Sequence, residues 1–136
     1  AVSSRARPAY SGRPRHALGG GALKAVPMLA YSAESGLGRL VGALLGPALQ
    51  RARAEPVFTA HLAAVLKSMA LDGRGVAWLP HSMVDAELRG RRLVEAGDAA
   101  WRLQAEIRLF RAAAAQTPAA EAFWDAAYAQ AGRGPA

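Results

Sequence analysis

The sequence contains no cysteine among its 136 residues. That absence excludes disulfide bonds, thiolate nucleophiles and zinc sites built on thiolates. Long apolar runs are missing too. The best candidate, residues 37–49, contains Arg39 and Pro47 and is shorter than the ~18 uninterrupted apolar residues that a membrane span needs. We therefore expect no membrane insertion and a cytoplasmic location. The first residue is not a methionine, and we expect the chain to be a piece of a longer protein.

Acidic residues are absent from the first 24 positions, and most of the net charge of +7 comes from this segment. Residues 1–24 hold five basic residues and carry +5, whereas the remainder, with 12 basic and 10 acidic residues, carries +2. The segment is rich in Pro and Gly and shows no aromatic or helical pattern, which predicts a solvated leader. A phosphate-binding arm is the alternative. The nearly balanced remainder does not have the charge pattern of a nucleic-acid-binding domain.

Beyond the leader, short apolar runs alternate with segments of helical periodicity. Expected strands cover residues 26–31, 56–58, 76–79, 92–94 and 103–110, and expected helices cover 35–49, 59–72, 82–89 and 117–131. Strands that alternate with helices indicate an α/β domain with a mostly parallel sheet flanked by helices. The uninterrupted apolar run around Trp78 predicts a strand buried on both faces.

Hydroxyl side chains stand where the helices are expected to begin. Ser32 or Ser35 is the expected N-cap of the first helix and Thr59 that of the second. Ser82 opens the spacing of a capping box before the third helix. Pro47 is expected to kink the first helix or to end it early.

Residues for catalysis or metal binding are sparse. The three histidines are dispersed and have neither metal-ligand spacing nor a carboxylate cluster beside them, so we expect no metal site. Five acidic residues fall near expected helix ends or turns, and none of them lies in an apolar setting that would raise its pKa: Asp72, Asp85, Glu87, Glu95 and Asp98. We therefore expect no catalytic residue and no cofactor, and we expect that the protein is not an enzyme.

The segment Thr59–Pro80 resembles the effector domain of LysR-type transcriptional regulators, with a helix, a Gly-x-Gly turn, a buried strand and Leu-Pro in order. Similar segments lie on both sides. Residues 26–39 resemble the strand and helix start that face the family's effector cleft, and residues 117–124 resemble its Ser-Pro-Ala…Ala-Phe-Trp helix. The resemblance covers residues 24–131, and the ordered set of segments carries it.

The resemblance implies a fold like that of type 2 periplasmic binding proteins, in which two α/β subdomains hold a ligand between them. Residues 1–24 would then be a leader loop with a possible first strand. Residues 25–110 would form the second subdomain, and 111–136 would return to the first with the C-terminal helix. The winged helix-turn-helix and most of the first subdomain would lie outside this sequence.

The implied function is the sensing of a small anionic effector, with Ser32, Ser35, Thr59 and His61 as its contacts. Backbone N–H groups at the two strand–helix junctions favour negative charge. Simple capping by the hydroxyls and an exposed first-turn histidine are the plainer alternatives. The full-length protein would form a homodimer or homotetramer and bind DNA only through the missing N-terminal domain. A solute-binding receptor of the same architecture and a small α/β enzyme are the alternative functions.

Overall fold

The computed structural model describes residues 1–4, 13–19, 24–106 and 108–131. The chain divides into two compact units, Ala1–Ala105 and Glu106–Ala136, which are described separately below. Much of the predicted leader, residues 5–12 and 20–23, lies outside the described residues. Of the described leader residues, Leu18 is buried, and its N–H donates to the Ala96 carbonyl oxygen at 2.6 Å.

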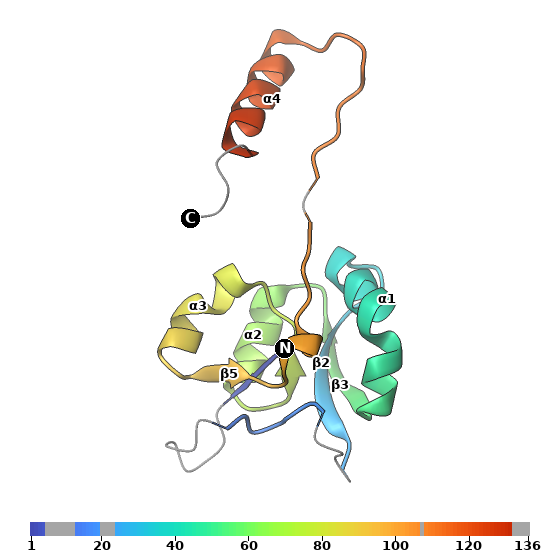
Figure 1. The fold of residues 1–136 in the computed structure, drawn as a ribbon, viewed down its shortest axis with the longest axis vertical. Coiled ribbons are helices and arrows are strands. Elements are labelled where there is room, and N and C mark those ends of the chain that lie inside the picture. The colour runs from blue at the N-terminus through green and yellow to red at the C-terminus, as the bar shows by residue number, and fades with distance from the viewer. Residues whose placement is uncertain (5–12, 20–23, 107, 132–136) are drawn as a thin grey trace. The chain divides into compact units, whose positions relative to one another are not determined.

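The first unit contains a mixed five-stranded sheet in the order β3-β2-β4-β1-β5 (Figure 1). Its central part is parallel, because β2 pairs in parallel with both β3 and β4. The short β1 enters between β4 and β5 and pairs antiparallel with each. The strands are β1 (Val2–Ser4), β2 (Val26–Tyr31), β3 (Ala54–Ala60), β4 (Val76–Ala77) and β5 (Leu93–Glu95).

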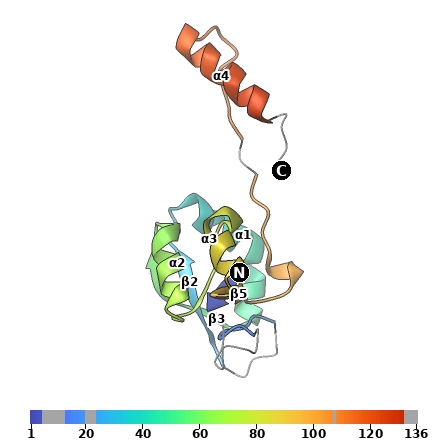
Figure 2. The same ribbon diagram turned by 90° about the vertical axis from the view of Figure 1, so that its left-hand side faces the viewer.

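Helices cover both faces of this sheet (Figures 1 and 2). One face holds α1 (Gly36–Arg51), which buries Leu45 and Leu49 one turn apart. The other holds α2 (Ala63–Leu71) and α3 (His81–Arg89). A short 3₁₀ turn, η1 (Ala99–Trp101), follows β5. The α/β class predicted from the sequence is confirmed.

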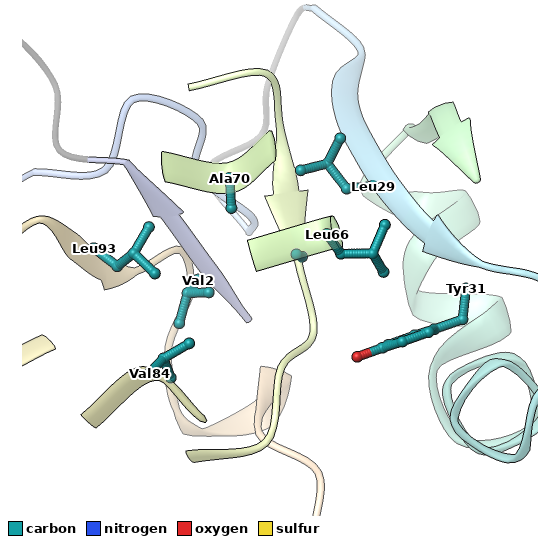
Figure 3. Packing of buried hydrophobic residues seen from close by; sticks show 8 residues of the cluster. Val2, Leu29, Tyr31, Leu66, Ala70, Val84 and Leu93 are labelled. Carbon is teal, nitrogen blue, oxygen red and sulfur yellow. The ribbon is translucent and has the colours of Figure 1, made fainter. Parts of the chain in front are cut away.

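The face under α2 and α3 forms one of two apolar clusters (Figure 3). Leu29, Leu66 and Leu93 come from three different elements and are each at most 1% exposed. Burying a side chain of this size stabilises the fold by about 1.5–3 kcal/mol. The cluster contains Val2, Leu29, Tyr31, Leu66, Ala70, Ala77, Val84 and Leu93.

The face under α1 forms the second cluster, which is centred on two tryptophans. Trp78 follows β4 directly and packs against Trp101, with ring centroids 6.3 Å apart. The Trp78 indole N–H donates to the Trp101 carbonyl oxygen at 3.0 Å, so its polar group is satisfied although the residue is only 6% exposed. The predicted burial of this apolar run is confirmed. The cluster contains Leu18, Val26, Leu45, Leu49, Val76, Trp78, Ala96 and Trp101.

Several local predictions from the sequence are wrong. Of the two alternatives predicted for Pro47, an early end of α1 is wrong, because the helix continues for another turn to Arg51. Thr59 lies inside β3 and Ser82 inside α3, so neither caps a helix; the N-caps of α2 and α3 are Leu62 and Pro80, without side-chain hydrogen bonds. Among the described residues of 103–110 no strand forms, because no neighbouring strand pairs with this segment.

The second unit is built around α4 (Pro118–Ala131). The helix begins with the predicted Thr-Pro pair, and the Ala120 N–H donates to the Thr117 hydroxyl at 3.3 Å. The Arg111 guanidinium forms two hydrogen bonds with Glu121, at 2.6 and 3.0 Å, and lies 5.4 Å from the Trp124 ring centroid. These contacts attach the segment before α4 to the helix itself.

Candidate functional site

The candidate site lies where β2 and β3 end, at the same edge of the sheet. Both strands run in the same direction, and Tyr31 and Ala60 are paired at their last residues. The Ser32 N–H extends this pairing by donating to the Ala60 carbonyl oxygen at 3.1 Å. The residues after the two strands, far apart in the sequence, are therefore neighbours in space. Ligands of α/β proteins bind outside such strand ends.

Ser35 is the N-cap of α1, as one of the two sequence alternatives predicted. Its hydroxyl oxygen accepts the Gly38 N–H at 2.9 Å, and the hydroxyl donates to the Ser32 carbonyl oxygen at 2.9 Å. Gly38 is required here, because a β-carbon at this position would overlap that carbonyl oxygen. The Gly36 and Leu37 N–H groups begin the helix ahead of its first internal hydrogen bond, which leaves two donors at the edge.

Ser32 and His61 form a direct side-chain pair at the same edge. The Ser32 hydroxyl oxygen lies 2.6 Å from His61 Nδ1, across 29 residues of sequence. Ser32 is half-buried after β2, while His61 is exposed between β3 and α2. The structure therefore brings together three of the four predicted site residues, Ser32, Ser35 and His61.

Thr59 is the fourth predicted residue, and it is placed differently. It lies within β3 opposite Ala30 and is exposed. The expected cap at Thr59 assumed that the second helix begins right after it, but β3 continues to Ala60 and α2 begins only at Ala63. Thr59 thus stands beside the edge without joining its hydrogen-bonded group.

Tyr31 brings a buried hydroxyl to the end of β2, a feature that the sequence did not point to. The residue is 9% exposed, and its hydroxyl has no hydrogen-bond partner among the described residues. Burial raises the pKa of the Tyr31 phenol to about 12, so the group is neutral at physiological pH. Its only signal in the sequence is a tyrosine ending an apolar run.

A second polar group that sequence reasoning missed joins α2 to α3. The Lys67 ammonium lies 2.9 Å from Glu87 Oε1 and donates to the Met83 carbonyl oxygen at 2.7 Å. Arg92 donates to the same Glu87 oxygen at 2.8 Å. A hydrogen bond from Lys67 is the largest effect that holds the pKa of the Glu87 carboxyl below its usual value. This group stabilises the scaffold behind the edge and lies apart from it in sequence and on different elements.

Two further findings concern metal sites and membrane-spanning helices. In the described ranges, no group of three or more His, Asp or Glu side chains is arranged to hold a metal ion. No helix of the described part is long and apolar enough to cross a membrane.

A family model of the LysR substrate binding domain matches residues 6–132. The chain belongs to this family. Its sequence is 32% identical over 98 residues to the HTH-type transcriptional regulator YjiE of Escherichia coli strain K12, covering 72% of this chain and 32% of YjiE. The identity is the same over 98 residues with the HTH domain-truncated regulator QseD of Escherichia coli O157:H7, 40% of which is covered. The chain thus spans about a third to two fifths of these relatives.

Solved structures of LysR-type proteins share the fold. The full-length HypT of Salmonella typhimurium, a hypochlorite-specific LysR-type transcriptional regulator, superposes with a TM-score of 0.69 at 25% identity, covering 92% of this chain and 40% of HypT. The bromide ion-bound regulatory domain of HypT gives 0.67 at 25% identity, with 92% and 56% covered. The periplasmic-binding-protein-like fold expected from the resemblance is therefore confirmed.

Proposed function

We propose that this chain is the effector-sensing part of a bacterial LysR-type transcriptional regulator. We further propose that the sheet edge at the ends of β2 and β3 binds a small anion. The observation that carries the proposal is the meeting of Ser32, Ser35 and His61 at one edge in a chain of the LysR family. Ser35 holds the start of α1 in place, and the first-turn amides favour negative charge. Thr59 would contribute its exposed hydroxyl from β3.

The relatives support an anion as the effector class. A regulatory domain with the same fold has been solved with bromide bound, and the full-length protein is hypochlorite-specific. Those properties are the relatives' own. For this chain we propose the same class of ligand, a small anion bound where N–H and hydroxyl groups lie close together.

The longer protein would use this part as a two-state element. An anion that binds one arrangement of the subdomains better than another shifts the population toward that arrangement and changes the geometry of a DNA-bound oligomer. In this proposal residues 25–110 form most of the second subdomain, residues 111–136 return to the first, and DNA is contacted only through a helix-turn-helix domain outside this sequence. The protein would act in the cytoplasm as a homodimer or homotetramer.

Anion titration of the full-length regulator tests the site. Bromide, hypochlorite and small carboxylates are first compared by thermal shift, and the best anion is titrated into Ser32→Ala and Thr59→Ala. Loss of a hydrogen bond to a charged ligand weakens binding by about 1.5–3 kcal/mol, roughly ten- to a hundred-fold. Ser68→Ala is the matched control, because that exposed hydroxyl donates only to the Ala64 carbonyl oxygen in α2.

Ser35→Ala measures the capping role by itself. Loss of the Gly38 hydrogen bond should lower the stability by about 1 kcal/mol whether or not a ligand binds there. Unchanged dissociation constants in Ser32→Ala and Thr59→Ala would leave only structural roles for the edge and contradict the proposed site.

A further inference from the structure

The Ser32–His61 pair limits what the edge can offer an anion. A hydroxyl has one proton to donate, and neutral imidazole has one nitrogen that accepts and one that donates. At 2.6 Å from Ser32, an unprotonated Nδ1 accepts the hydroxyl proton. Ser32 then presents only oxygen lone pairs to a ligand, which repel an anion.

Protonation of His61 reverses the direction of this hydrogen bond. In the imidazolium both ring nitrogens are donors, so Nδ1–H donates to the Ser32 oxygen. The Ser32 hydroxyl proton is released and can be donated outward, while His61 adds a positive charge beside it. A single proton therefore converts the pair from an acceptor into a donor for an anion.

We infer that anion binding at this edge is coupled to proton uptake by His61, so that the anion site forms fully only when the imidazole is charged. This inference rests on the anionic effector proposed above and adds its regulation. Histidine is the side chain type that ordinarily gains a proton near physiological pH, so pH is the variable that tests the coupling. Anion affinity rises as the pH falls and levels off once His61 is fully protonated.

The turn and the elements next to the pair carry the following charged residues. The turn before α1 holds Glu34, and the Arg39 guanidinium donates to its carbonyl oxygen at 2.6 Å. Lys67, the one charged residue of α2, is held by Glu87. β2 has no charged residue, and Glu55 lies near the opposite end of β3.

The test uses the full 136-residue chain with bromide as the probe. Nitrogen NMR of labelled histidine reports which ring nitrogen of His61 carries the proton, and amide shifts of Ser32, Gly36 and Leu37 report bromide binding. Without bromide at high pH, we expect Nδ1 to be unprotonated. From about pH 8 to pH 5, we expect the bromide affinity to rise roughly tenfold, the effect of a hydrogen bond gained with a charged group.

Reciprocity supplies a second readout. If a proton strengthens bromide binding tenfold, saturating bromide must raise the midpoint of the His61 titration by roughly one pH unit. His61→Gln keeps a polar side chain but cannot take up a proton, and it should remove the pH dependence. His81→Gln, an exposed histidine on α3, is the matched control and should retain it.

Each possible result supports or overturns the coupling between proton uptake and anion binding. A proton on His61 Nδ1 at high pH, equal bromide affinity at the two pH values, or an unchanged pH dependence in His61→Gln overturns the coupling while the anion site itself stands. If bromide shifts none of the edge amides at either pH, the proposed anion site fails, and the coupling fails with it.

Discussion

At the scale of single residues, Trp78 contributes both apolar area and a hydrogen bond to the core. It packs on Trp101 and donates its indole N–H to the Trp101 carbonyl oxygen. We expect Trp78→Ala to lower the free energy of unfolding by about 3–5 kcal/mol. Trp78→Phe keeps a ring but removes this hydrogen bond and leaves the Trp101 carbonyl oxygen with only the longer contact from the Ala1 ammonium at 3.5 Å. A smaller loss is therefore expected, about 1–3 kcal/mol. Urea denaturation measures both, and a Trp78→Ala midpoint equal to that of the unsubstituted chain would show that this side chain is not central.

Glu87 makes stability depend on pH. The pKa of its carboxyl is lowered, first through the Lys67 hydrogen bond, so the unfolded chain takes up the proton more readily than the folded one. The stability due to this group is present above the usual value of 4.5 and is lost as the pH falls through the lowered value in the folded chain. We expect Glu87→Gln to be less stable at neutral pH and to show a shallower loss in acid.

Asp85→Asn is the matched control for this prediction. Asp85 is on the same helix and pairs with Arg89 at 2.8 Å, but its side chain is 40% exposed against 8% for Glu87. Exposed pairs contribute little, so this variant should follow the unsubstituted chain across the pH range. If the free energy of unfolding changes equally with pH in Glu87→Gln and in the unsubstituted chain, the Lys67–Glu87 pair is not the source of the pH dependence.

At the scale of elements, the approach of β4 to β2 depends on Gly75. A β-carbon at Gly75 would lie 2.5 Å from the Pro27 carbonyl oxygen, whereas one at Gly42, in α1, would meet nothing within 4 Å. We expect Gly75→Ala to lower the melting temperature, because the strands must separate to admit the methyl group. Gly42→Ala should raise stability by about 0.5–1 kcal/mol through helix propensity. Thermal unfolding of the two variants compares them directly, and a Gly75→Ala chain as stable as Gly42→Ala would contradict the close strand contact.

At the scale of the whole molecule, the second unit exposes large apolar side chains. Phe110 is 86% exposed, Phe123 64% and Tyr128 75%. Apolar surfaces of this kind associate with a partner. We expect the isolated chain to self-associate in sedimentation experiments and Phe123→Ser to weaken that association. Ala122→Ser, on another side of α4, is the control. A chain that stays monomeric at high concentration would contradict this prediction.

The sequence alone determined most elements and some of their ends. Apolar spacing of two or of three to four residues reflects which face of a strand or helix is buried, and this predicted β2, β4, all four α-helices and the burial of Trp78. Ser35 as the N-cap of α1 follows from the hydrogen bonds that its hydroxyl can form with near neighbours in the chain. The ordered set of such segments was enough to indicate the LysR family.

Only the tertiary structure decided which distant residues meet. The Ser32–His61 pair depends on β3 lying in parallel beside β2, and the Lys67–Glu87 pair depends on α2 and α3 sharing one face of the sheet. The alternation in 103–110 predicted a strand, but a strand forms only where another pairs with it, and none does so with the described part of that segment. The sequence also could not show that Thr59 is a strand residue and not an N-cap. The length of β3 is set by its pairing with β2, which local spacing does not encode.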